Sequence, residues 1–148
     1  MKNFIFLFGL FFCSSAFGGD YKIGHEPLGG VYFGGEYTRS VALGYAAIFK
    51  DSDKSGPFHN GLYADAEFAE KGRSFSLGWA RTSDVGIARF GISALNTKTE
   101  GLGDQKYIGG TLTMSIAGLS FRIGHYRLNN ANSSVRNDFN SVSVGLGI

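Results

Sequence analysis

Hydrophobic residues alternate with small or polar residues along most of the chain. The clearest segment is 74–80, where Phe75, Leu77 and Trp79 alternate with serine, glycine and alanine. Successive side chains of a β-strand point to opposite faces, so this period of two predicts a strand with one apolar and one polar face. The same pattern recurs in segments 31–37, 41–49, 62–68, 88–94, 108–116, 119–124 and 141–148. The sequence therefore predicts a chain of consecutive β-strands.

The connections between these segments are of two kinds. Residues 38–40, 70–72 and 117–118 are typical of tight turns, whereas 51–60, 96–105 and 129–138 are longer, polar and rich in Asn, Asp, Ser and Gly. We expect a surface partner, if there is one, to contact the three longer loops. No segment has the period of an amphipathic helix. The predicted fold is all-β, an eight-stranded up-and-down antiparallel membrane β-barrel, because closure removes the free edges of such a sheet.

The N-terminus has the layout of a secretory signal peptide. A positively charged start at Lys2 precedes an unbroken apolar run, Phe4–Phe12, and the small residues Ala16 and Gly18 follow it. This run is too short for a transmembrane helix, which needs about 20 residues. We therefore predict a signal peptide over residues 1–18 and a β-barrel domain over residues 19–148.

Composition and charge exclude several classes of protein. The chain has 148 residues with 15% aromatic and 18% charged residues and 23 glycines, which fits neither a disordered chain nor a helical bundle. A net charge of +2 without a basic stretch gives no nucleic-acid footprint. The single cysteine and three histidines on separate segments have no metal-ligand spacing. The sequence predicts no metal, cofactor or nucleic-acid partner.

The residues on the face opposite the apolar one indicate which face of the sheet lies inside the barrel. They are mostly Gly, Ser, Thr and Ala, whereas a surface in water normally carries many Lys and Glu. This favours a membrane barrel, with apolar residues toward lipid and a narrow polar interior, over a soluble ligand-binding barrel with the reverse facing. A few charges share the small-residue face and are predicted to pair inside the barrel: Glu36, Asp65, Glu67, Arg89 and Arg122. The alternative is that they are ordinary exposed charges.

Aromatic residues near the predicted strand ends also favour a membrane barrel. Membrane barrels carry girdles of aromatic side chains at the two lipid–water interfaces. The candidates for such girdles are Tyr32, Tyr37, Tyr45, Phe49, Trp79, Tyr107 and Tyr126.

The C-terminal stretch carries a more specific pattern. Residues 125–132 (HYRLNNAN) precede a loop, and 136–141 (RNDFNS) open the last alternating segment. This stretch resembles the end of the outer-membrane lipid A 3-O-deacylases, eight-stranded barrels with a His-x-Ser-Asn-Ala motif before a loop and an acidic or amide residue at the start of the last strand. The resemblance implies a histidine base and a serine nucleophile on the lipid-facing wall. It covers about the last 25 residues.

The catalytic pair of that family is not matched residue by residue. Alignment on Asn130-Ala131 places Arg127 at the family's histidine, and alignment on His125 places Arg127 at the nucleophile. Either way no hydroxyl lies two residues after a histidine, and an ester hydrolase needs a nucleophile within reach of its base. The resemblance implies these candidate residues: His125 as base, Ser133 or Ser134 as nucleophile, Asn140 in place of the acid, and Arg127, Asn129 and Asn130 for binding.

The expected function follows from the barrel and its facing. We expect a small, non-catalytic barrel in the outer membrane of a Gram-negative bacterium, in contact with outer-membrane lipid or lipopolysaccharide and acting structurally or through its loops. Two alternatives stay open: a lipid A-modifying esterase that uses His125, and a secreted soluble barrel that binds a ligand in its interior. In the esterase alternative, the enzyme is a lipid A ester hydrolase.

Overall fold

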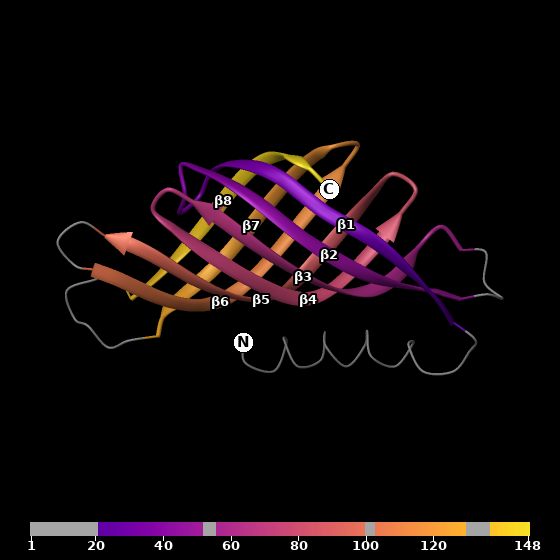
Figure 1. Cartoon of the computed structure of the whole chain (residues 1–148), viewed down its shortest axis with the longest axis horizontal. Coiled ribbons are helices and arrows are strands. Elements are labelled where there is room, and N and C mark those ends of the chain that lie inside the picture. Colours follow the sequence, from indigo (N-terminus) through magenta and orange to yellow (C-terminus); the bar gives the residue numbers. More distant parts are fainter. Residues whose placement is uncertain (1–20, 52–55, 100–102, 130–136) are drawn as a thin grey trace.

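The protein is a ring of eight antiparallel strands (Figure 1). The computed structural model describes residues 21–51, 56–99, 103–129 and 137–148, so the expected signal peptide lies outside the described residues. The strands are β1 Tyr21–Gly34, β2 Arg39–Asp51, β3 His59–Ala69, β4 Gly72–Ser83, β5 Gly86–Thr99, β6 Gly103–Ile116, β7 Leu119–Leu128 and β8 Asp138–Gly147. None of the described segments forms a helix long and apolar enough to span a membrane.

Each strand pairs with the next along the chain, and β1 also pairs with β8. This closing seam joins Gly30–Gly34 to Ser143–Gly147 in antiparallel register. The sheet therefore forms a closed barrel, as the alternating segments predict. Since neighbouring strands are antiparallel, β1, β3, β5 and β7 end, and β2, β4, β6 and β8 begin, at one end of the barrel, here the loop end. At the opposite, terminal end lie the beginnings of β1, β3, β5 and β7 and the ends of β2, β4, β6 and β8, together with turns 84–85 and 117–118 and the residue Ile148.

The strands are longer than the alternating segments alone predict. They contain 10 to 14 residues, and β4 has 12 although its clean alternation covers only 74–80. The prediction of a long loop over 96–105 is wrong, because β5 runs to Thr99 and β6 begins at Gly103. Similarly, Arg39 and Ser40 belong to β2 and the turn precedes them. Backbone pairing with the neighbouring strand continues after the hydrophobic alternation has ended.

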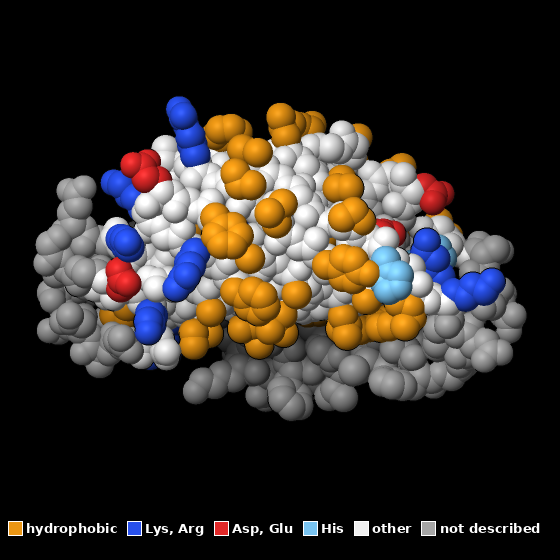
Figure 2. All heavy atoms as spheres, in the orientation of Figure 1, with side chains coloured by type: hydrophobic (Ala, Val, Ile, Leu, Met, Phe, Trp, Pro, Cys, Tyr) orange, Lys and Arg blue, Asp and Glu red, His pale blue; other side chains and the backbone are white. Residues whose placement is uncertain are grey.

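The outer wall is apolar and the interior is largely polar. Outward side chains include Leu77, which is 54% exposed, and Leu112, which is 39% exposed. Inward positions carry many small hydroxyl side chains: Ser40, Ser74, Ser76, Ser93, Thr111, Thr113, Ser115, Ser120 and Ser143 are all buried. In Figure 2 hydrophobic side chains gather over the middle of the visible face, and charged side chains lie toward its two ends. The small-residue face of each strand therefore lies inside the barrel, as expected from the sequence.

Four of the five charges predicted to lie inside meet there. Arg89 Nη1 is 3.1 Å from Asp65 Oδ2, and Arg122 Nη1 is 2.6 Å from Glu67 Oε2. Arg122 Nη2 also lies 3.7 Å from Asp65 Oδ2, which links the two pairs. Glu36 is different: it is exposed in the turn between β1 and β2. The prediction placed Glu36 inside because it extended the alternation of the first segment past the end of β1.

Several aromatic residues expected at the lipid interfaces lie inside the barrel instead. Tyr32, Tyr37, Tyr107 and Tyr126 are each at most 5% exposed. Near the loop end, Phe139 packs edge-on against Tyr107 at 5.0 Å and stacks on Tyr126 at 5.3 Å between ring centroids. Toward the terminal end a second apolar cluster fills the interior, formed by Leu28, Ala46, Ile48, Tyr63, Ala80 and Ile87. The charge network therefore lies in an interior that also holds two apolar clusters.

The Tyr37 side chain is buried at the loop end of the barrel. Desolvation, and secondarily the charge of Glu67, raise the pKa of this side chain well above its ordinary value. The phenol donates a hydrogen bond of 3.0 Å to the backbone carbonyl of Asn96. Tyr37 thus ties the β1–β2 turn to β5 at the loop end.

Candidate functional site

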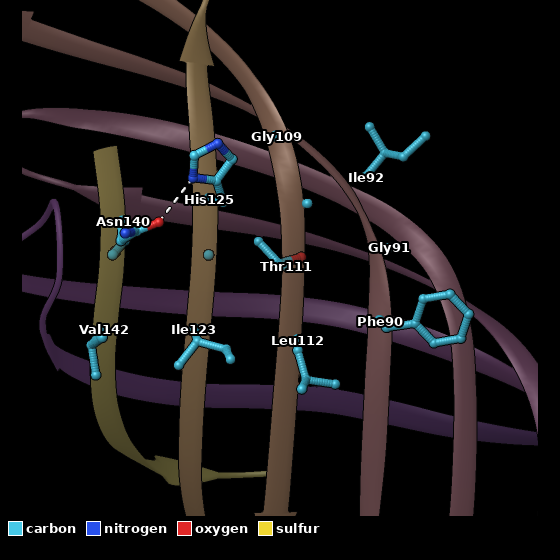
Figure 3. A pocket seen from close by; sticks show the side chains of 13 residues that line it. Phe90, Gly91, Ile92, Gly109, Thr111, Leu112, Ile123, His125, Asn140 and Val142 are labelled. Atoms are coloured by element: carbon cyan, nitrogen blue, oxygen red, sulfur yellow. Dashed lines mark hydrogen bonds between the residues drawn. The ribbon is translucent and has the colours of Figure 1, made fainter. Parts of the chain in front are cut away.

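A large concavity lies on the outer wall, across β5 to β8. Cross-strand register places Ile92, Gly110, His125 and Asn140 side by side in one outward row. A second outward row, nearer the terminal end, contains Phe90, Leu112, Ile123 and Val142. The space between and above these rows is a groove of about 760 Å³, here called the His125 groove (Figure 3).

A missing side chain in the outward rows opens this groove. The row between the two outward rows is Gly91, Thr111, Gly124 and Ser141, whose side-chain positions face the interior, so backbone forms the floor of the groove. Gly110 leaves a gap in the outward row itself. A Cβ atom added there would meet only the Gly91 carbonyl oxygen, at 3.8 Å, whereas one at Gly91 would lie 2.2 Å from the Leu77 carbonyl oxygen. Gly110 is therefore a position where the groove can be filled without disturbing the sheet.

His125 and Asn140 form the polar part of the groove. The distance between His125 Nδ1 and Asn140 Oδ1 is 2.8 Å, and both side chains are on the outer wall (Figure 3). Because an amide oxygen only accepts hydrogen bonds, Nδ1 carries the proton and donates. In the neutral ring Nε2 then keeps its lone pair and can accept a proton or a hydrogen bond. The arrangement matches a base held by an orienting group, but a neutral amide stabilises an imidazolium less than a carboxylate does.

A nucleophile is missing from this wall in the described part of the chain. Outward positions of β5 to β8 within 86–98, 104–128 and 138–147 carry no Ser, Thr or Cys. Ser141 faces inward, where its Oγ accepts a hydrogen bond of 3.2 Å from the backbone N–H of Glu36. Arg127 is outward and exposed, two residues beyond His125. Ser133, Ser134 and Asn130 lie outside the described residues.

Asn129 lies at a different place from His125. Its backbone N–H donates to the Lys106 carbonyl oxygen at 2.8 Å, and it lines a second pocket that extends over β3 to β6. Arg127 lies opposite Asp138 in the register of β7 and β8, so an acidic residue occupies the position beside it. The structure therefore brings His125 and Asn140 together and separates Asn129 from them.

Sequence reasoning missed the other walls of both pockets. Gly110 and Ile92 complete the row of His125, and Arg73, Asn96 and Lys106 line the second pocket. A signal in the sequence could have identified them. If the alternation of segments 74–80, 88–94 and 108–116 is continued past their ends, Arg73, Asn96 and Lys106 fall on the apolar face. Within the described ranges, no group of three or more His, Cys, Asp or Glu is placed to hold a metal ion.

Comparison with known proteins adds no relative to this picture: no family model, no curated protein and no solved structure matches the chain.

Proposed function

We propose that this chain is a small outer-membrane β-barrel protein of a Gram-negative bacterium, without catalytic activity, acting as a structural element or through its loops. One observation carries the proposal: large hydrophobic side chains cover the outside of a closed sheet whose interior holds paired charges and hydroxyls. In water that distribution exposes apolar surface far beyond the usual few hundred Å². In a bilayer the same surface contacts acyl chains, and the closed sheet leaves few unpaired backbone groups.

Strand length supports the same location. A transmembrane strand needs about 9–11 residues, and the eight strands have 10 to 14. Charged side chains flank the apolar wall, with Arg73 and Lys106 toward the loop end and Arg81 toward the terminal end. Such flanking cations lie where lipid headgroups begin.

Fractionation and site-specific labelling test the proposal. Expressed in a Gram-negative host, the protein should enter the outer-membrane fraction and migrate differently on gels before and after heating. Cysteine in place of Leu77 or Leu112 should resist a water-soluble maleimide in the folded protein, and Asp84→Cys in an exposed turn should react. All three should react after unfolding, and the parent protein gives the background. Ready labelling of folded Leu77→Cys and Leu112→Cys, with recovery in soluble periplasm, would support the secreted barrel instead.

The second candidate function is hydrolysis of a lipid A ester in the His125 groove. The hydrogen bond between His125 and Asn140 on a groove in the apolar wall favours it. The absence of an outward hydroxyl on the described parts of β5 to β8 counts against it, since Ser133 or Ser134 would have to reach His125.

Mass spectrometry of lipid A separates the two functions. We expect unchanged acylation when correctly inserted protein is expressed. If acyl chains are lost, the esterase assignment requires that His125→Ala restores them and that Gly110→Leu, which fills the groove, does the same. Serine variants at Arg81 or another distant outward position serve as controls.

A further inference from the structure

A second concavity lies on the outer wall near the loop end. This pocket of about 360 Å³ spans β3 to β6 and is here called the Arg73 pocket. One outward row across it contains Arg73, Asn96 and Lys106 on β4, β5 and β6. The next row toward the terminal end contains Phe75, Ala94 and Ile108 on the same strands. A polar row therefore lies directly beside an apolar one.

The two cations of the polar row are positioned to share one anion. Neighbouring strands lie about 4.8 Å apart, so Arg73 and Lys106 leave the sheet about 10 Å apart with Asn96 between them. Their long side chains can bend toward a common group, and the Asn96 amide offers a third donor. Neither cation has an ion pair within the described ranges of the chain. The acids nearby have other basic neighbours, since Asp104 lies opposite Lys98 and Glu70 precedes Lys71.

The apolar row gives the pocket a second kind of surface. Phe75 is 50% exposed and Ile108 is 48% exposed, and the small Ala94 between them leaves a hollow. Beyond the polar row, toward the loop end, the outward residues Lys98 and Asp104 are charged. The pocket thus lies where the apolar wall meets the charged rim, which is the depth of lipid headgroups if the wall is in a bilayer.

We propose that the Arg73 pocket binds the phosphate of a membrane lipid between Arg73 and Lys106, with the lipid's acyl chains packed against Phe75, Ala94 and Ile108. Guanidinium and ammonium groups are the usual protein donors to phosphate, and Arg can bind two of its oxygens at once. A free phosphate ion would use the polar row alone, so the apolar row makes the lipid the favoured source of the phosphate. This inference rests on the membrane location proposed above.

Spin-labelled lipids test the site in the folded, full-length protein reconstituted into phosphatidylcholine vesicles. Electron paramagnetic resonance measures how strongly labelled phosphatidic acid and labelled phosphatidylcholine associate with the protein surface. We expect a preference for phosphatidic acid that falls about fivefold for each charge removed in Arg73→Gln/Lys106→Gln. Ala94→Leu fills the hollow without changing charge and should also lower the preference.

The matched control removes two charges at the opposite end. Lys50 and Arg81 are exposed cations near the terminal end, Lys50 on the inner face of its strand and Arg81 on the outer face, and Lys50→Gln/Arg81→Gln should keep the preference. Equal loss in both double variants would show a general charge effect and overturn the site. Complete competition by inorganic phosphate at the affinity of the lipid would overturn the role of the apolar row.

The same spectra separate this inference from the proposed function. Motionally restricted phosphatidylcholine label without a preference for phosphatidic acid would overturn the site and leave the membrane location standing. Absence of restricted label with either lipid would overturn both.

Discussion

Arg122 contacts both acids of the interior and is 7% exposed. Its Nε donates to Thr113 Oγ1 at 3.1 Å, and its guanidinium carbon lies 4.3 Å from the centroid of the Tyr32 ring. Glu67 also accepts hydrogen bonds from the hydroxyls of Ser40 and Ser74. Removing one partner of a buried ion pair leaves the other charge without compensation, which costs more than the pair itself contributes.

Replacement of Arg122 by methionine should therefore lower the free energy of unfolding by about 3–5 kcal/mol. Urea unfolding in lipid vesicles, followed by the fluorescence of the single tryptophan, measures the change. Arg81→Met, an exposed arginine, is the matched control and should cost less than about 1 kcal/mol.

The double variant Arg122→Met/Glu67→Gln checks the cause of that loss. It should recover part of the stability, because the uncompensated Glu67 charge is then absent. Equal costs for Arg122→Met and Arg81→Met would contradict a stabilising interior network.

The β6–β7 hairpin shows how one element accommodates an unfavourable residue. Ile116 and Leu119 pair directly, so the turn consists of Ala117 and Gly118 alone, with φ values of 49° and 85°. Two positive φ values match the type I′ turn that follows the twist of antiparallel strands. Glycine adopts this conformation freely, but alanine in the left-handed region is strained by about 1–2 kcal/mol.

Ala117→Asn should stabilise the protein, because asparagine tolerates the left-handed conformation better than alanine. We expect the free energy of unfolding to rise by about 0.5–1 kcal/mol. Gly118→Ala should lower it by about 1 kcal/mol through backbone strain alone, since a Cβ there has nothing within 4 Å. Urea unfolding measures both variants, and a stabilising Gly118→Ala would contradict this account of the turn.

β1 shows how far pairing can extend a strand beyond its sequence pattern. The alternation predicts a strand only from Val31, whereas β1 begins at Tyr21 because β2 pairs with it as far as Asp51. The early part of β1 contains Pro27, which has no backbone N–H. Among the described residues no strand pairs with 21–28 on the β8 side, and such an edge tolerates proline.

At the scale of the whole molecule, apolar side chains cover the outer wall and polar side chains line much of the interior. A soluble protein has the reverse arrangement. Trp79 lies on this wall, in register with Leu62 and Phe90, and packs against Phe49 at 6.4 Å between ring centroids. It is the only tryptophan of the chain. Its fluorescence therefore reports on what touches the apolar wall.

Brominated acyl chains should quench Trp79 strongly in reconstituted vesicles, and aqueous acrylamide should quench it weakly. The matched control moves the tryptophan out of the wall: in Trp79→Phe/Phe58→Trp it replaces Phe58, which is 56% exposed and lies between β2 and β3. The order of the two quenchers should reverse in that variant. Stronger quenching of Trp79 by acrylamide than by brominated lipid would place the wall in water.

The sequence by itself determined the strands, their approximate order in a meander and the face on which each side chain lies. These follow from a period of two that is local to each strand, which is why Asp65, Glu67, Arg89 and Arg122 could be placed inside before their partners were known. The sequence did not determine where the strands end, so the predictions of Glu36 inside the barrel and of a long loop at 96–105 are wrong.

Only the tertiary structure decided which residues meet. Register across the strands brings His125 to Asn140 and Gly110, and groups Arg73 with Asn96 and Lys106, although these residues are far apart along the chain. It also brings Tyr107 and Tyr126 together with Phe139 inside the barrel. The physical reason is that alternation constrains a residue's side of the sheet, whereas pairing and closure constrain its neighbours.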